Sequence, residues 1–498
     1  MFVILAIVFI VILLYYFDRK QFTYWKDKGI PQLDNQTILI GDIKDLVLQR
    51  KSIAKFYGDS CVSFQSSPIV GSYFSYRPLI IINDLELAKT ILATDFHYFH
   101  DRGIFIDPTI DPLTENLFLL PGEKWNNLRK KLTPLFSTSK LKMMLPIIQD
   151  SVDILDNYIS DNLELDKTFI TDIRDLSSNF NLTMISSIAY GTQNDCINEP
   201  NNLFRLTSLK VLDQNFFNNF RLVTALFMPK ISKIFKICVF DKEVSKFFLD
   251  ITKETIKYRE ETDINRNDFL QLFMQLKNEG LRKANGSEST DADSFTLNEV
   301  AANLFLFVIA GYETTSATIS YCLYELAKNS ANKKKVQAEI DELDNEEFSY
   351  EKISKLKYLE NCVNETLRKY PVIPVLNREC LHDYRVPNTD LVIPKGTPII
   401  VPVYAMQRNP ELFENPTEFN PDRFDNKNSL LLSFGHGNRS CIGNRMSLIV
   451  IKTCLCALLS KYDVKLVSPL REIEFTPKIP SLAPTEKLLV SFSRRNKF

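Results

Sequence analysis

FGHGNRSCIG, residues 434–443, is the most informative stretch of this 498-residue chain. Three of the 14 glycines of the chain lie between Gly435 and Gly443, which indicates a backbone that needs conformations other residues avoid. From Asn444 to Leu459 apolar residues recur at helical spacing, so Cys441 is expected at or just before a helix N-terminus. The helix dipole and free amide groups there favour a thiolate, which is both a nucleophile and a soft metal ligand.

Cys441 has three interpretations: a structural cysteine, a catalytic nucleophile or a metal ligand. A lone cysteine is usually structural, but the glycine cluster and the nearby Arg439 weaken that interpretation. A zinc site needs about four Cys and His ligands, and no ligand spacing is formed by the four histidines, His97, His100, His382 and His436. A haem iron needs only one protein ligand on its proximal face, and glycine-rich turns let backbone amides approach the sulfur.

FGHGNRSCIG resembles the signature of the cytochrome P450 superfamily, Phe-x-x-Gly-x-Arg-x-Cys-x-Gly, at every specified position. One small departure follows it, because the residue six after the cysteine is usually alanine and is Ser447 here. The resemblance implies a mainly α-helical fold with small β-sheets (α+β), in a single large haem domain with a long central helix. It also implies haem b as the cofactor, Cys441 as the iron ligand, and Phe434 and Arg439 as cofactor contacts.

The clearest helix is expected from about Leu297 to Lys328, about 46 Å long at 1.5 Å per residue. Thr296 and Glu299 have the spacing of a capping box at its start. Short β-branched runs at 78–82 and 391–403 predict small sheets at two ends of the chain. KANGSESTDAD, residues 283–293, predicts a solvated loop.

Inside this helix, AGYETT at 310–315 places an acid and hydroxyl groups among apolar residues, where their burial costs free energy unless something compensates. One interpretation is structural, with a hydroxyl bonded back to the preceding turn and Glu313 paired elsewhere. The motif also resembles the oxygen-activation motif of the family, which implies that Glu313 and Thr314 organise water and deliver protons as catalytic residues.

Glu365 and Arg368 lie three residues apart, so they share one helix face. Such a pair is usually an exposed ion pair on the protein surface. In the resembling family it is buried and joined by the arginine of Pro-x-Arg-Phe, here Arg423, which implies that the three residues hold the cysteine loop in place.

Trp125 and Arg129 lie four residues apart, so both side chains can reach one ligand. They resemble a Trp-x-x-x-Arg motif that binds haem propionates, and Arg378 matches a further propionate contact of microsomal members. A basic proximal face for an acidic flavoprotein is an alternative to plain surface charge for Lys124, Lys130, Lys131, Lys140, Lys142 and Arg445. Pocket-lining positions of relatives match Ile309, Ala310, Val372 and Ile373, which suggests an apolar small-molecule substrate.

The first 17 residues, MFVILAIVFIVILLYYF, are uncharged and long enough to span a membrane as a helix. Basic residues follow, so the flank is expected on the cytosolic side. The expected organisation is a transmembrane anchor over 1–17, a basic linker over 18–34 and a haem-thiolate monooxygenase domain over 35–498. The expected location is the endoplasmic reticulum membrane, single-pass, with the catalytic domain in the cytosol.

Balanced charge, with 60 Lys+Arg against 61 Asp+Glu, argues against nucleic acid as a partner. The resemblance implies a monooxygenase that inserts one oxygen atom from O2 into a small apolar molecule. Its electrons would come from NADPH through NADPH–cytochrome P450 reductase, with cytochrome b5 as a candidate second donor. Two alternatives remain: a reductase-independent haem-thiolate isomerase or dehydratase, and a non-enzymatic membrane-tethered haem carrier or sensor.

Overall fold

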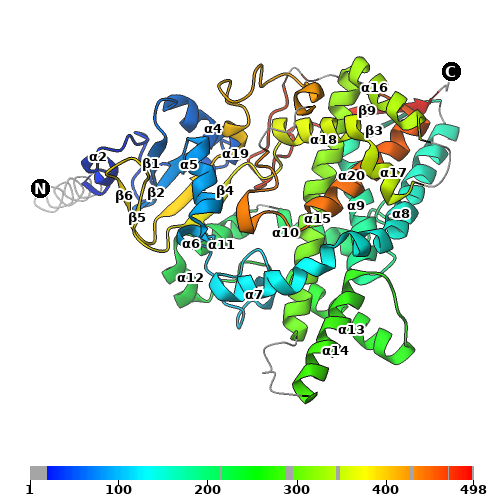
Figure 1. Cartoon of the computed structure of the whole chain (residues 1–498), viewed down its shortest axis with the longest axis horizontal. Helices are drawn as coiled ribbons and strands as arrows, with labels where there is room; N and C mark the ends of the chain where they lie inside the picture. Colours follow the sequence, from blue (N-terminus) through cyan, green and yellow to red (C-terminus); the bar gives the residue numbers. More distant parts are fainter. Residues whose placement is uncertain are drawn as a thin grey trace, which may run out of the picture.

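The computed structural model describes residues 20–165, 167–213, 215–286, 295–343, 348–425, 431–468, 470 and 472–495. A sheet-rich part lies at one end of the elongated molecule and a larger helical body at the other (Figure 1). The predicted anchor over 1–17 lies outside the described residues. So does most of the predicted loop at 283–293, whose first four residues complete a helix that ends at Gly286.

The largest sheet brings together the two β-branched runs of the sequence. Its strand order is β1 (Ile69–Phe74), β2 (Arg77–Ile82), β7 (Pro398–Val401) and β4 (Leu376–Glu379). β2 and β7 pair in parallel, with Ile80 opposite Ile399, so the runs predicted to form separate sheets share one. Along β2, Leu79 and Ile81 join one apolar cluster and Ile80 and Ile82 another, because successive side chains point to opposite faces.

Two smaller sheets complete the β structure of the described residues. In one, β9 (Leu489–Arg494) lies antiparallel between β3 (Phe169–Asp172) and β8 (Tyr462–Leu466). The other is the hairpin of β5 (Tyr384–Arg385) and β6 (Val392–Ile393).

Helices make up most of the remaining described chain. The larger helical elements are α4 (Ile53–Ser63), α7 (Gly122–Leu132), α8 (Thr138–Leu165), α9 (Ile173–Tyr190), α10 (Leu203–Leu212), α11 (Phe216–Phe227), α13 (Lys242–Thr262), α14 (Phe269–Gly286), α15 (Leu297–Lys328), α16 (Ser330–Asp341), α18 (Lys357–Lys369) and α20 (Asn444–Lys461). Shorter helical elements are α2 (Tyr24–Asp27), α3 (Lys44–Val47), α5 (Leu85–Lys89), η1 (Thr90–Thr94), α6 (Phe96–Phe99), η2 (Pro112–Thr114), η3 (Thr133–Phe136), α12 (Pro229–Phe235), α17 (Tyr350–Lys355), α19 (Val403–Met406), η5 (Pro421–Phe424) and η6 (Gly437–Arg439).

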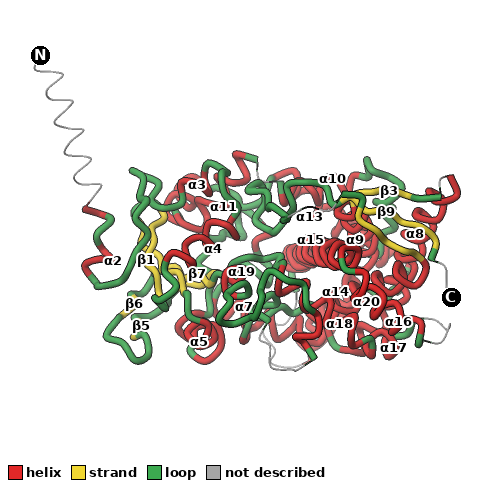
Figure 2. The backbone as a smooth tube through the Cα atoms, turned by 90° about the horizontal axis from the view of Figure 1, so that it is seen from above, coloured by secondary structure: helices red, strands yellow, loops and turns green. Residues whose placement is uncertain are grey.

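The long helix α15 runs through the helical body and contacts α9, α13, α18 and α20 (Figure 2). Its predicted capping box is present: Glu299 N donates to Thr296 Oγ1 at 3.1 Å, and Thr296 N donates to a Glu299 carboxylate oxygen at 2.8 Å. Among the described helices, α15 is the one long and apolar enough to cross a membrane, but most of its apolar stretch is buried inside the protein. It is therefore the central core helix that the sequence predicts.

The described part of the predicted linker, residues 20–34, packs against the largest sheet. Trp25 is fully buried, and its indole Nε1 donates to Ser72 O in β1 at 3.1 Å. Phe22 and Ile30 belong to the same apolar cluster as strand β2. Covering an apolar sheet face removes these apolar and aromatic side chains from water, which favours the observed packing of the segment.

Candidate functional site

The cysteine turn is shaped by two left-handed glycines. Gly435 has φ of 74° and Gly437 has φ of 71°, a region that favours glycine. A Cβ atom on Gly437 would lie 2.2 Å from the carbonyl oxygen of Leu92 in η1, so no larger residue fits there. Cys441 N donates to Phe434 O at 2.8 Å, which closes the turn three residues before α20 begins.

Cys441 differs from the other eight cysteines of the chain because its side chain is exposed, whereas seven are buried and Cys238 is half-buried. Even so, burial by the surrounding protein raises the pKa of the Cys441 thiol. The Gly443 amide, Arg129 and Arg102 act in the opposite direction, although they do not outweigh burial. The expectation that the helix end favours a thiolate at Cys441 is therefore wrong for the free thiol, because burial outweighs the amide and the two arginines. A coordinating metal ion would deprotonate the thiol.

Four guanidinium groups gather beside the cysteine turn, and we call Arg102, Arg129, Arg378 and Arg439 the arginine cluster. Arg129 of α7 donates to Ser440 O at 3.0 Å. The guanidinium of Arg439 lies 4.0 Å from the centre of the Trp125 ring, and its Nε donates to His100 O at 2.8 Å. Arg378 projects from β4.

Burial and mutual repulsion raise the free energy of the charged guanidinium groups in this cluster. Burial, followed by the charge of Arg439, lowers the pKa of Arg378 to about 10. Burial, followed by the charge of Arg102, lowers the pKa of Arg439 to about 9. Arg378 Nε and Arg439 Nη1 are buried and have no hydrogen-bond acceptor among the described residues. Buried cationic donors without acceptors fit an anionic group with several oxygens, such as the two propionates of haem b.

The central helix α15 has one open face. Ala310 is exposed and Ile309 and Thr314 are half-buried, whereas their neighbours along the helix are mostly buried. Thr314 Oγ1 donates to Ala310 O at 2.6 Å, in the preceding turn. The open face therefore offers small and apolar groups and one hydroxyl.

Glu313 points elsewhere. Its carboxylate forms a buried ion pair with Arg174 of α9 and accepts a hydrogen bond from Ser481 Oγ at 2.7 Å. The structure thus shows the arrangement of the structural interpretation, with the threonine bonded to the preceding turn and the acid paired with another element. Glu313 and Thr314 are adjacent in sequence but face different surroundings.

Glu365, Arg368 and Arg423 are brought together in the structure. Arg368 Nε donates to Glu365 Oε2 at 2.7 Å and its Nη2 to Oε1 at 2.9 Å, with both side chains fully buried. Arg423 Nε, in η5, lies 3.1 Å from Glu365. Arg368 Nη1 also donates to Gln407 O at 2.8 Å, and the Gln407 side chain accepts from Leu432 N at 2.8 Å, two residues before Phe434. A chain of hydrogen bonds therefore connects this ion cluster to the cysteine turn.

Comparison with known proteins identifies the family. Residues 45–491 match the family model described as cytochrome P450. The chain is 34% identical to cytochrome P450 6d1 of Musca domestica over 97% of this chain and 98% of that protein. It is 34% identical to probable cytochrome P450 6d2 of Drosophila melanogaster, over 99% of this chain and 100% of that protein. Cytochrome P450 6k1 of Blattella germanica is 32% identical, over 98% and 96% of the two chains.

This chain belongs to the cytochrome P450 family. The match confirms the predicted mainly α fold with small sheets and the predicted likeness to insect members. It also establishes haem b as the cofactor, bound through a cysteine thiolate, and the chain as a haem-thiolate monooxygenase.

The remaining predicted contact residues of this cytochrome P450 lie in different environments. Phe434 is half-buried and packs against the main apolar core. Val372 is buried in that core, with its carbonyl accepting from Leu482 N at 2.9 Å, whereas Ile373 is 41% exposed. Of these two, only Ile373 has a side chain accessible enough to meet a substrate. Among the predicted basic residues, Lys124, Lys130, Lys142 and Arg445 are exposed, and Lys142 is paired with Glu351.

Sequence reasoning about this cytochrome P450 missed Arg102, Arg174 and Ser481. Arg102 Nε donates to Phe118 O at 3.1 Å, and burial followed by the charge of Arg378 lowers the pKa of Arg102 to about 9. An isolated arginine in a loop carries no spacing signal, and Arg174 lies 139 residues from its partner Glu313. Only the fold brings these residues to their partners.

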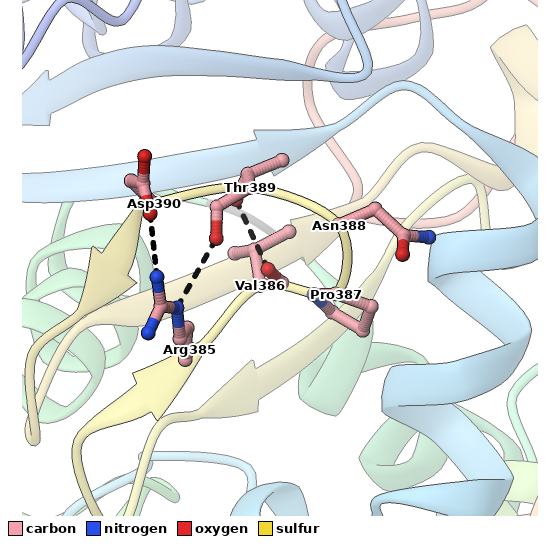
Figure 3. A pocket seen from close by; sticks show the side chains of 6 residues that line it. All are labelled: Arg385, Val386, Pro387, Asn388, Thr389 and Asp390. Carbon is pink, nitrogen blue, oxygen red and sulfur yellow. Dashed lines mark hydrogen bonds and ion pairs between the residues drawn. The ribbon is translucent and has the colours of Figure 1, made fainter.

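A shallow hollow of about 460 Å³ lies on the β5–β6 hairpin of the cytochrome P450 and is lined by residues 385–390 (Figure 3). Arg385 pairs there with Asp390, and both side chains are largely exposed. Ion pairs between exposed groups contribute little to stability, and none of the predicted site residues lies in this turn. The hollow is a surface feature of the hairpin.

Proposed function

We propose that this cytochrome P450 oxidises small apolar molecules at a haem held by Cys441, with electrons supplied by NADPH through a flavoprotein reductase. One observation carries the proposal: an exposed cysteine at a glycine-shaped turn lies beside four guanidinium groups, and two of these groups have buried donors with no acceptor in the described part of the chain. The cysteine suits the iron, and the donors suit the propionates. When bound, the haem supplies oxygen activation and electron transfer.

In this proposal, the residues of the turn and its surroundings bind and orient the cofactor. Cys441 Sγ is the iron ligand, and Phe434 packs beside the turn. Arg129, Arg378 and Arg439 contact the propionates, and Trp125 supports Arg439 by stacking. Arg102 joins them because it shares the same cluster of like charges.

Thr314 and Glu313 are proposed to supply protons. The Thr314 hydroxyl lies on the open face of α15, where it can pass a proton from its oxygen to a neighbouring water or substrate. Glu313 is held by Arg174 and Ser481, so it can serve this route only when its carboxyl group leaves that pair. Thr314 would therefore act as a relay, because its hydroxyl oxygen takes a proton from a water molecule as it releases its own.

The substrate pocket is proposed to include Ile309, Ala310 and Ile373, because their exposed or half-buried apolar side chains favour an apolar ligand. Val372 supports it from the core. These apolar groups and the likeness to insect relatives favour xenobiotics or lipids as the class of substrate that is oxidised. Glu365, Arg368 and Arg423 are proposed to hold the cysteine turn in place.

The electron donor is proposed to be NADPH–cytochrome P450 reductase, with cytochrome b5 as a second donor, and O2 as the co-substrate. Residues 1–17 are proposed to anchor the protein in the endoplasmic reticulum membrane, with the remaining chain on the cytosolic side. Their uncharged composition and the basic residues after them support this arrangement.

The test is reconstitution of the full chain with haem, purified reductase and NADPH, assayed against a panel of apolar compounds. We expect substrate-dependent NADPH and O2 consumption with formation of hydroxylated product, together with the ferrous–carbon monoxide absorption of thiolate-bound haem. Cys441→Ser should lose that absorption and all turnover, whereas Cys238→Ser, at a half-buried cysteine, should retain both. Product formation without O2 or reductase would contradict the proposed function.

A further inference from the structure

Asp101 joins three elements that carry groups of the arginine cluster. Its Oδ1 accepts a hydrogen bond from Gly122 N, the first residue of α7, at 2.7 Å. The same oxygen lies 3.4 Å from Arg439 Nη2 in η6. The Asp101 backbone carbonyl accepts from Glu379 N, at the end of β4, at 2.9 Å. Asp101 therefore lies where α7, β4 and the cysteine turn meet.

Asp101 also contributes a negative charge beside the arginine cluster. Among the described residues, Asp101 is the one carboxylate in an ion pair with a member of the arginine cluster. Its side chain is only 16% exposed and that of Arg439 only 1% exposed, so water screens their interaction weakly. His100 Nδ1 lies 2.7 Å from the same carboxylate oxygen and acts as the donor. Within the described part of the chain, the four guanidinium groups therefore share one paired carboxylate.

The orientation of Arg439 does not depend on Asp101 alone. Arg439 Nε donates to His100 O, its Nη2 donates to Leu120 O at 2.9 Å, and its plane stacks on Trp125. The contact with Asp101, at 3.4 Å, is longer than the two hydrogen bonds to backbone carbonyls. The main effect of the carboxylate is therefore its charge.

We propose that Asp101 is a positioning residue that partly neutralises the arginine cluster and thereby sets the positive charge that the haem propionates and the iron experience. The proposal rests on the proposed role of Arg378 and Arg439 as propionate contacts. Ferrous haem carries one positive charge fewer than ferric haem, so added positive charge nearby favours the ferrous state. Removing the Asp101 charge should raise the reduction potential and strengthen retention of the dianionic cofactor.

The test compares Asp101→Asn with Asp107→Asn in the haem-loaded full-length protein. An asparagine at 101 keeps an oxygen that can accept from Gly122 N, so the change mainly removes charge. Asp107 lies in the same segment, and within the described part of the chain its carboxylate accepts hydrogen bonds only from Thr109, so it is a matched control for charge removal. We expect a positive shift of the haem reduction potential in Asp101→Asn and no shift in Asp107→Asn. Haem transfer to a scavenging protein should be slower for Asp101→Asn.

The reduction potential decides the outcome. A potential in Asp101→Asn that equals that of Asp107→Asn, or a negative shift, would overturn the proposal whatever the rate of haem transfer. Asp101→Glu keeps the charge and should retain the wild-type potential. If Asp101→Asn does not fold while Asp101→Glu folds and keeps the wild-type potential, the requirement for a negative charge at position 101 is supported. If neither variant yields folded protein, the proposal that Asp101 acts mainly through its charge is rejected.

Arg439→Met tests the proposed role of Arg439 as a propionate contact separately from the proposed role of Asp101. If Arg439→Met retains haem as the wild type does, the propionate assignment of Arg439 fails. If Arg439→Met loses haem while the two asparagine variants have equal potentials, only the proposed role of Asp101 fails.

Discussion

Arg174 and Glu313 illustrate how single residues control the central helix. Both side chains are buried, at 14% and 7% exposed, and they belong to α9 and α15. Arg174 Nη1 has no acceptor among the described residues, so the pair already carries an incomplete hydrogen bond. Removing one partner of such a pair leaves the other charge buried and alone, which is far more costly than removing both.

Arg174→Met is expected to lower the free energy of unfolding by about 3–5 kcal/mol, the cost of an uncompensated buried charge. The double variant Arg174→Met/Glu313→Gln should recover most of that loss, because it leaves no isolated charge. Urea unfolding of the haem-loaded protein measures both. Lys210→Met, which breaks a largely exposed pair with Glu243, is the control and should change stability by less than about 1 kcal/mol. Additive losses in the double variant would contradict this account.

At this scale, sequence predicts residues whose spacing is fixed by a turn or a helix. The cysteine turn needs Gly435 and Gly437 because the backbone is left-handed there, and Trp125 and Arg129 share α7. The surroundings of Glu313 were not predictable, because Arg174 and Ser481 lie 139 and 168 residues away along the chain. The predicted roles of the site residues stay predictions until they are tested by substitution.

Between elements, the buried carboxylate of Glu365 joins α18 to η5. Glu365→Gln is expected to destabilise the protein by about 3–5 kcal/mol and to reduce haem content, because Arg368 and Arg423 lose their shared counter-charge. Asp422→Asn is the matched control in η5, the short helix that carries Arg423, since Asp422 pairs with Lys335 and both side chains are about half exposed. Absorbance ratios of haem to protein and urea unfolding provide the measurements. Equal haem content and equal stability in the two variants would contradict the proposal that Glu365 supports the cysteine turn.

Asp42 gives the contact between residues 37–43 and β1 a pH dependence. Its Oδ2 accepts from Tyr73 N at 2.8 Å and from Ser72 Oγ at 3.0 Å, and burial raises the pKa of Asp42 to about 7. In the unfolded chain the pKa is about 3.9. Between these two values the folded state retains a proton that the unfolded state releases, so this group lowers stability as pH rises and its effect levels off above about pH 7.

The expected loss from Asp42 between pH 4 and pH 8 is up to about 4 kcal/mol. Asp42→Asn cannot ionise, so its stability relative to the wild type should increase from pH 5 to pH 8. Urea unfolding at several pH values measures this difference. Asp59→Asn, at an exposed carboxylate paired with Lys51, should show no such trend, and a pH-independent difference between Asp42→Asn and the wild type would contradict the raised pKa.

The predictability of the elements follows the range of their interactions. The bounds of α15 were predictable because its cap and its apolar stretch are local. The pairing of β2 with β7 was not, because Ile80 and Ile399 are 319 residues apart and neither run specifies its partner. The sequence left the place of Trp25 open for the same reason, since an aromatic residue after an apolar segment fits a membrane interface and a protein core equally well, and the structure packs it onto β1.

Across the whole molecule, surface charge near the cysteine turn is expected to control the encounter with the reductase. Lys124 and Lys130 are exposed on α7, the helix that carries Arg129 to the turn. Lys124→Glu/Lys130→Glu should slow haem reduction by the reductase about tenfold or more at low salt, with a smaller difference at high salt, because electrostatic steering is screened. Stopped-flow reduction measures it. Lys246→Glu/Lys253→Glu, at exposed positions of α13, is the matched charge-reversal control; equal slowing in both would reject docking at α7.

The parallel pairing of β2 with β7 has a consequence for how the protein folds during its synthesis. Strands β1 and β2 emerge early from the ribosome, but β7, the partner of β2 on its other side, is made more than 300 residues later. The arginine cluster likewise depends on residues from 102 to 439, and Cys441 follows it. A nascent chain therefore has no complete place for haem until translation is almost finished, so cofactor insertion belongs to the last moments of synthesis or to the time after release.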